Sequence, residues 1–140
     1  MSKVWQNWLS AWAIFVALFG LVLAGGAFAA TDGQTTMLFT VFGNPLPADI
    51  DAHHRFAIGL MGAVTMGWGL TYLGAFKALY ALEPATAAPI WRYLLFAGLA
   101  WYVIDSSISV ATGFWMNAVS NTVLMVLFLI PLVKSGAMRS

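Results

Sequence analysis

The chain has 140 residues, of which 61% are apolar and only 8% charged, and its mean hydropathy is +0.85. Soluble domains carry about a quarter charged residues. This composition therefore excludes a soluble domain and predicts an integral membrane protein. The net charge of +1 gives no indication of a nucleic-acid partner. The absence of cysteine excludes disulfides, thiolate metal sites and thiol redox chemistry.

Four apolar stretches are long enough to cross a membrane as helices. A bilayer core about 30 Å thick needs about 20 apolar residues in helical form, and the qualifying stretches are 9–30, 56–82, 91–111 and 113–133. We therefore expect an all-α polytopic protein, with residues 1–140 forming a single four-helix transmembrane domain.

The first stretch also resembles a secretory signal peptide. Lys3 precedes it, and Ala27-Phe28-Ala29 fits an A-x-A cleavage site. Its apolar run is longer than the usual signal core of about 7–15 residues. We therefore expect a retained helix.

The connections differ in length. Residues 31–54 form a long polar loop, within which 37–42 is apolar but too short to span, so we expect it at the membrane interface or against the bundle. A Pro- and Ala-rich turn, 83–89, follows the second span. The last link, at Thr112-Gly113, is so short that it predicts an antiparallel hairpin of the last two spans.

Basic residues indicate the orientation. With four spans, only Arg55 falls on the side of the long loop; five others fall on the opposite side, namely Lys3, Lys77, Arg92, Lys134 and Arg139. The positive-inside rule then predicts both termini in the cytoplasm and the long loop on the opposite side of the membrane.

One group of polar residues is a candidate ligand pocket. Asp105 lies 13 residues after Arg92, which is about 20 Å along a helix, so it falls within the hydrocarbon layer if Arg92 marks the inner boundary. An intramembrane carboxylate needs a partner, and we expect Arg55 to be that partner. Asn117 and Asn121, four residues apart, share one face of the last span. The predicted cluster also includes His54, with His53, Ser106 and Ser109 nearby.

Two interpretations of this cluster compete. It could bind a small molecule or handle protons, or its members could simply hydrogen-bond neighbouring helices and fix their packing. The sequence shows no chain of ionisable groups from the cluster to the cytoplasmic side, which argues against an ion path.

Cofactors and catalysis find little support. His53 and His54 are adjacent and point about 100° apart on a helix, so they cannot ligate one haem axially, and we predict no metal site. GxSxG, HExxH and P-loop motifs are absent from the sequence, so we do not expect an enzyme. A membrane enzyme using Asp105 and His54 as acid and base is the weakest alternative. No cofactor is predicted, although a bound lipid, quinone or pigment would be compatible with the composition.

Two stripes of residues suggest helix contacts. An aromatic ridge at helical spacing in the first span favours packing, or contact with a partner subunit or lipid tail; it comprises Trp5, Trp8, Trp12, Phe15 and Phe19. The second span is rich in small residues that let helix backbones approach closely. The residues expected at that contact are Gly59, Gly62, Ala63 and Gly67, with Ala63 and Gly67 as a small-xxx-small pair.

The motif His53-His54-Arg55-Phe56, followed by Gly59-Leu60-Met61-Gly62-Ala63, opens the second span. In this motif and in its helix layout the chain resembles uncharacterised bacterial four-helix inner-membrane proteins of the domain-of-unknown-function type. The resemblance implies the arrangement of helices and carries over no catalytic residue.

The sequence therefore favours an accessory, non-catalytic subunit of a larger bacterial inner-membrane complex, respiratory or photosynthetic. Its expected partners are membrane lipids and other membrane-protein subunits, and its expected role is to stabilise neighbours or shape access for a hydrophobic molecule. The alternative is a small-molecule or lipid binder or carrier that uses the outward Arg55, Asp105 and asparagine pocket.

Overall fold

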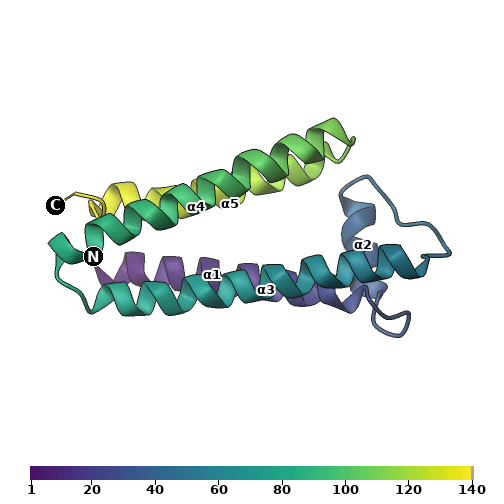
Figure 1. The fold of residues 1–140 in the computed structure, drawn as a ribbon, viewed down its shortest axis with the longest axis horizontal. Helices are drawn as coiled ribbons and strands as arrows, with labels where there is room; N and C mark the ends of the chain where they lie inside the picture. The colour runs from purple at the N-terminus through teal and green to yellow at the C-terminus, as the bar shows by residue number, and fades with distance from the viewer. Residues whose placement is uncertain (140) are drawn as a thin grey trace. The chain divides into compact units, whose positions relative to one another are not determined.

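A computed structural model describes residues 1–139, and in this range the chain is helical throughout its regular structure (Figure 1). The helices in this range are α1 (Lys3–Gly25), α2 (Gly33–Val41), α3 (Ala52–Tyr80), α4 (Pro84–Ala111) and α5 (Trp115–Ser135). Four of them, α1, α3, α4 and α5, are long and apolar enough to cross a membrane. The predicted all-α class with four membrane-length helices is confirmed; the orientation of the termini stays a prediction.

The helix boundaries differ from those predicted by hydropathy. The helix α3 begins at Ala52 because Asp51 caps it: Oδ1 of Asp51 accepts the backbone N–H groups of His53 and His54 at 2.8 and 2.9 Å. The helix α4 begins at Pro84, since a first-turn proline needs no hydrogen bond for its missing N–H. Hydropathy marks the apolar part of a helix and misses a first turn that is set by a cap or by a proline.

The long loop is partly ordered as the helix α2. Residues 37–41 of the apolar segment belong to it, Phe42 is its C-terminal cap, and the side chains of Met37 and Val41 are exposed. At the other end of the chain, the link between α4 and α5 turns at Gly113, which has φ of +85°, a value that favours glycine. The two helices pack against each other over their length, so the predicted hairpin is confirmed (Figure 1).

The chain divides into two compact units. The first comprises Met1–Trp12 and the chain from Leu73 onward, and the second comprises Ala13–Tyr72. The core of the first unit is a group of stacked aromatic rings. The ring centroid of Phe76 lies 5.4 Å from that of Trp91 and 6.0 Å from that of Phe128. Trp12 stacks on Phe128 with a centroid distance of 5.1 Å. Aromatic contacts of this kind fix the helices of the unit tightly.

The second unit is held by close contact between the backbones of α1 and α3. A Cβ atom added at Gly69 would lie 2.6 Å from the backbone nitrogen of Ala17, and one at Gly62 would collide with that of Ala24. On α1, a Cβ at Gly20 would collide with the backbone nitrogen of Met66. Only glycine permits this approach, as in other small-residue helix contacts.

The register of that contact differs in part from the prediction. Gly62 does lie against α1, at Ala24, and Gly59 lies against Ala27, just beyond the end of α1. Ala63 and Gly67 are exposed, and a Cβ at Gly67 would meet nothing within 4 Å. One residue along a helix rotates the side chain by about 100°. The true contact series, spaced by three and four residues, therefore runs through Gly62 and Gly69.

Candidate functional site

The α4–α5 hairpin contains a polar cluster, which we call the Asp105 cluster: Asp105, Ser109, Asn117 and Asn121. The side-chain amides of Asn117 and Asn121 donate to Oδ1 of Asp105 at 2.8 and 2.6 Å. Asn117 also donates to the Ser109 hydroxyl at 2.9 Å, and that hydroxyl donates to the backbone oxygen of Asp105 at 2.7 Å. The structure thus brings together three of the predicted pocket residues, because residues 105 and 109 of α4 and 117 and 121 of α5 face each other across the turn.

The two oxygens of the carboxylate are used unequally. All the hydrogen bonds that the described residues make to the side chain of Asp105, including a longer one of 3.3 Å from Ser109, end on Oδ1. Ser109 and Asn121 are buried, whereas Asp105 is only partly so. The arrangement can therefore hold a carboxylate in place and leave Oδ2 able to accept a further donor.

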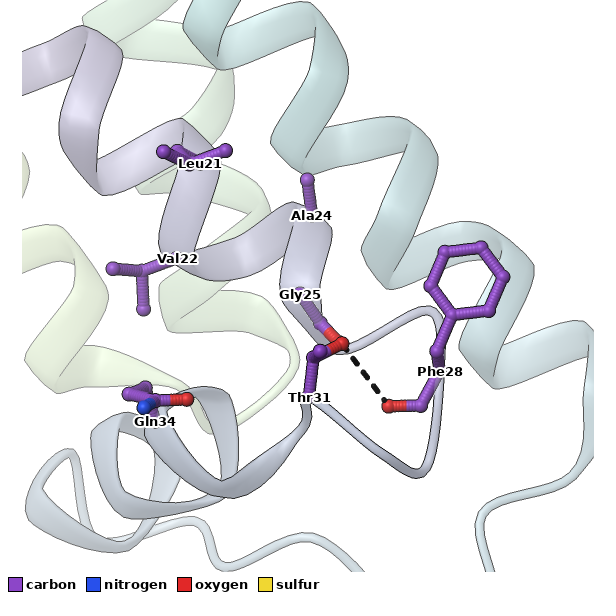
Figure 2. Close-up of a pocket in the computed structure, with 7 residues that line it drawn as sticks. All are labelled: Leu21, Val22, Ala24, Gly25, Phe28, Thr31 and Gln34. Atoms are coloured by element: carbon purple, nitrogen blue, oxygen red, sulfur yellow. Dashed lines mark hydrogen bonds between the residues drawn. The ribbon is translucent and has the colours of Figure 1, made fainter.

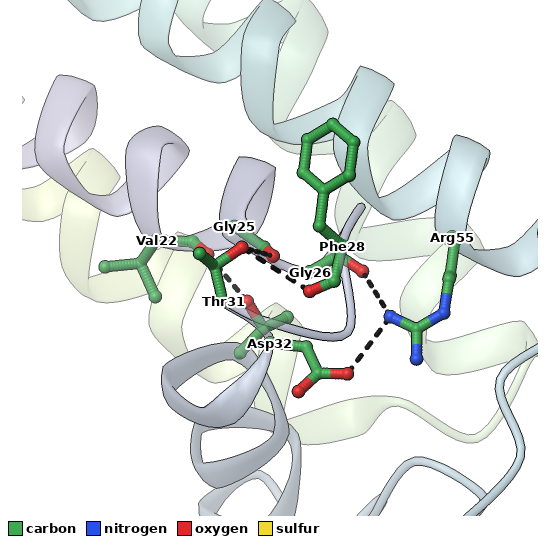
Figure 3. Close-up of polar contacts among 8 residues, drawn as sticks. Val22, Gly25, Gly26, Phe28, Thr31, Asp32 and Arg55 are labelled. Carbon is green, nitrogen blue, oxygen red and sulfur yellow. Dashed lines mark hydrogen bonds and ion pairs between the residues drawn. The ribbon is translucent and has the colours of Figure 1, made fainter.

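Arg55 has a different partner from the one predicted. Its Nη1 donates to Oδ2 of Asp32 at 3.0 Å and to the backbone oxygen of Gly26 at 3.3 Å (Figure 3). Both side chains are mostly buried. Asp32 immediately precedes α2 and belongs to the same compact unit as Arg55, so the pairing is local. Arg55 is thus paired with Asp32 and not, as expected, with Asp105.

Side-chain donors satisfy the backbone carbonyls at the C-terminal end of α1. The last turn tightens, so that Gly26 N–H bonds to Leu23 at 3.0 Å and leaves the carbonyl of Val22 without its usual partner. The Thr35 hydroxyl of α2 donates to that carbonyl at 2.6 Å, and the Thr31 hydroxyl donates to Gly25 at 2.7 Å (Figure 3). Since unsatisfied carbonyls are costly in an apolar medium, the Arg55–Asp32 pair and the two threonines have a structural role here.

The two histidines lie at the start of α3, on the surface. His54 Nδ1 lies 2.6 Å from Oδ2 of Asp51, and His53 is fully exposed. The hydrogen bonds from His54, first through its backbone and then through its ring, lower the pKa of Asp51 below its ordinary value. Residues 1–139 contain no group of three side chains suited to a metal ion. Asp51 and His54 thus fix the first turn of α3. His54 belongs to the unit Ala13–Tyr72, whereas the Asp105 cluster belongs to the other unit.

The predicted aromatic ridge of α1 does not present one outward face. Trp12 is 6% exposed and donates its indole N–H to the backbone oxygen of Leu124 at 2.9 Å. Trp8 donates likewise to Leu127 at 2.8 Å and meets Trp5 edge to face, with centroids 6.0 Å apart. Phe15 is exposed and Phe19 half-buried. Trp12 therefore packs within its own unit, in agreement with the packing interpretation, and contact of the ridge with a partner or a lipid stays a prediction.

The hydrogen bond from Trp8 satisfies a backbone carbonyl that Pro131 leaves without a donor. Pro131 lies inside α5 and has no N–H, so it cannot donate to the carbonyl four residues earlier, which is that of Leu127. The Trp8 indole donates to that same carbonyl. A proline inside a span is the signal that could have led sequence analysis to search for this donor.

A shallow hollow of about 540 Å³ opens beside the end of α1 (Figure 2). Its lining is mostly apolar, with Thr31 and Gln34 as the polar members. The residues that line it are Leu21, Val22, Ala24, Gly25, Phe28, Thr31 and Gln34. Its composition suits a hydrocarbon chain rather than a polar metabolite.

Comparisons of the chain with protein-family models, with curated proteins and with solved structures found no match. The resemblance to uncharacterised four-helix proteins thus stays a prediction, and function has to be argued from the chain's own residues.

Proposed function

We propose that this protein is a non-catalytic accessory subunit of a larger bacterial inner-membrane complex, respiratory or photosynthetic. In this role it binds neighbouring subunits through its membrane-spanning helices and stabilises them or shapes the path of a hydrophobic molecule such as a quinone. The observation that carries the proposal is the exposure of α4.

The helix α4 is the least covered of the four membrane-length helices. In its most apolar 18-residue stretch, 11% is buried, against 22–39% in the other three. Its exposed apolar face includes the two most exposed aromatic side chains of the helix, Tyr93 at 75% and Phe96 at 70%. Further members of this face are Val103, Ile104, Ile108 and Val110. At 100° per residue these six side chains occupy about half of the helix circumference, which is enough for a partner helix to pack on.

The polar residues support a packing role over a catalytic one. Asn117 and Asn121 direct their amides to Asp105, and Arg55 is engaged by Asp32 and by a backbone carbonyl. Such bonds fix helices against one another. A catalytic pair needs an acid and a base that face a common substrate position, and these contacts serve helix ends and helix pairs instead.

The experiment is purification of a tagged chain in mild detergent, followed by mass spectrometry of the proteins that accompany it. We expect stoichiometric larger subunits. Ile104→Trp should reduce their recovery, because a bulky group on the exposed face of α4 blocks a partner helix without touching the core. Val64→Trp is the matched control, since Val64 is about equally exposed on α3 (64% against 61%). A wild-type chain that purifies alone contradicts the proposal.

A second candidate function, binding of a lipid, is favoured by the hollow at the end of α1. Its apolar lining would hold an acyl chain, and the polar side chains of Thr31 and Gln34 in that lining would contact the headgroup. Lipid mass spectrometry of the purified protein tests this candidate: Val22→Trp should remove a lipid that co-purifies with the wild type, and no retained lipid in either protein contradicts it.

A further inference from the structure

Among the described residues of its own unit, the carboxylate of Asp105 forms no ion pair with a basic residue. Its hydrogen-bond partners there are two amides and a hydroxyl, all neutral groups. A carboxylate at membrane depth is costly unless it is paired. The neighbouring exposed residues Ile104 and Ile108 indicate an apolar surrounding and not an aqueous one.

The basic residues of the same hairpin are too far away to pair with Asp105. Arg92 lies 13 residues before Asp105, and Lys134 lies 13 residues after Asn121, so each is about 20 Å along its helix from the cluster. Arg92 also donates through Nε and Nη2 to the backbone oxygen of Met138, at 3.2 and 2.9 Å. In the other unit Arg55 is paired with Asp32.

The carboxylate is nevertheless held in a fixed position. The two amide donors converge on Oδ1 at 2.8 and 2.6 Å, which orients the group and leaves Oδ2 as the acceptor for a further donor. Asp105 is partly exposed and borders the exposed apolar face of α4 at Ile104 and Ile108. A helix that packs on this face would therefore bring its own side chains to the carboxylate.

From this geometry we infer that Asp105 is the contact point for a lysine or arginine in a membrane-spanning helix of the neighbouring subunit. The negative charge of Asp105 favours a basic side chain, and the exposed apolar face of α4 favours a membrane-spanning helix as the element that contains it. A basic side chain inside the membrane carries the same desolvation cost as Asp105, so the two groups stabilise one another only when the subunits meet. The inference rests on the proposed accessory function and names the chemistry of its partner.

The test compares three tagged chains in mild detergent by quantitative mass spectrometry: the wild type, Asp105→Asn and Asp105→Glu. Asp105→Asn removes the charge and keeps an oxygen acceptor for the two asparagines. We expect recovery of the partner to fall about tenfold or more in this variant and to persist in Asp105→Glu. Asp49→Asn, the same change in the exposed loop, is the matched control and should leave recovery unchanged.

Each outcome decides something different. If the wild type brings a partner and Asp105→Asn retains it, this inference is overturned while the accessory function stands. Loss in both Asp105→Asn and Asp105→Glu overturns it as well, because shape rather than charge would then control binding. The recovered subunit must contain a lysine or arginine within one of its spans, and a partner without one also refutes the inference. If the wild type brings no partner, the proposed function itself fails.

Discussion

The indole N–H of Trp8 replaces a backbone donor that Pro131 cannot provide. In an uninterrupted helix the N–H of residue 131 would bond to the carbonyl of Leu127, and in this structure Trp8 Nε1 donates to that carbonyl at 2.8 Å. Trp8→Phe keeps most of the ring and removes the donor. We expect it to lower the free energy of unfolding by about 1–2 kcal/mol, the cost of leaving a partly buried carbonyl unsatisfied.

The loss of stability in Trp8→Phe should occur only when residue 131 is a proline. In a Pro131→Ala background the alanine N–H can bond to Leu127 itself, so Trp8→Phe should then cost only its change in packing. The two substitutions should therefore couple by about 1 kcal/mol in a double-mutant cycle. The assay is unfolding in detergent micelles followed by circular dichroism. Trp5→Phe is the matched control, because Trp5 contacts Trp8 through its ring alone. Equal costs of Trp8→Phe in the proline and alanine backgrounds would refute the reasoning.

Three further predictions concern helix packing and helix ends. Gly62→Ala should lower the free energy of unfolding by about 1–3 kcal/mol, because its Cβ would collide with the backbone of α1, whereas Gly67→Ala should be neutral or stabilising by up to about 1 kcal/mol. Thr35→Val removes the fully buried hydroxyl that donates to the carbonyl of Val22. It should lower the free energy of unfolding by about 1–3 kcal/mol in the same assay. The pKa of Asp51 is lowered below 3.8, so its cap is fully formed above about pH 3.8 and lost as pH falls through the lower folded-state value. The first turn of α3 should therefore loosen in acid, as measured by amide chemical shifts between pH 6 and pH 2.

Each of these has a clear contrary result. Equal effects of alanine at positions 62 and 67 would mean that the α1–α3 contact has another register. A Thr35→Val variant as stable as the wild type would show that the carbonyl of Val22 finds another donor. Amide shifts in the first turn of α3 that stay constant down to pH 2 would show that the Asp51 carboxylate does not hold that turn.

The sequence predicted well those features that depend on hydropathy and chain length. Four membrane-length helices follow from four apolar stretches, and the hairpin of α4 and α5 follows from a link too short for any other connection. The grouping of Asp105 with Asn117 and Asn121 was predictable for the same reason, since a short turn places the end of one helix beside the start of the next.

Features that depend on helix rotation or on partner choice were not predictable. Five glycines between 59 and 74 offer several contact series, and the pattern alone cannot distinguish Gly62 and Gly69 from Ala63 and Gly67. Arg55 had several carboxylates within reach in principle, and the local turn after α1 determined that Asp32 was the partner. Trp12 lay on an apparent aromatic ridge, but the ring packing of Phe76 and Phe128 draws it inward.

The most direct test of the accessory role is photo-crosslinking in cells from the exposed face of α4. Benzoylphenylalanine at position 96 replaces an aromatic side chain that is already 70% exposed, so the helix should be undisturbed. The proposed function predicts one abundant crosslinked product containing a second membrane protein. Crosslinks to lipid alone would contradict it, because the face that carries the proposal would then be covered by the bilayer.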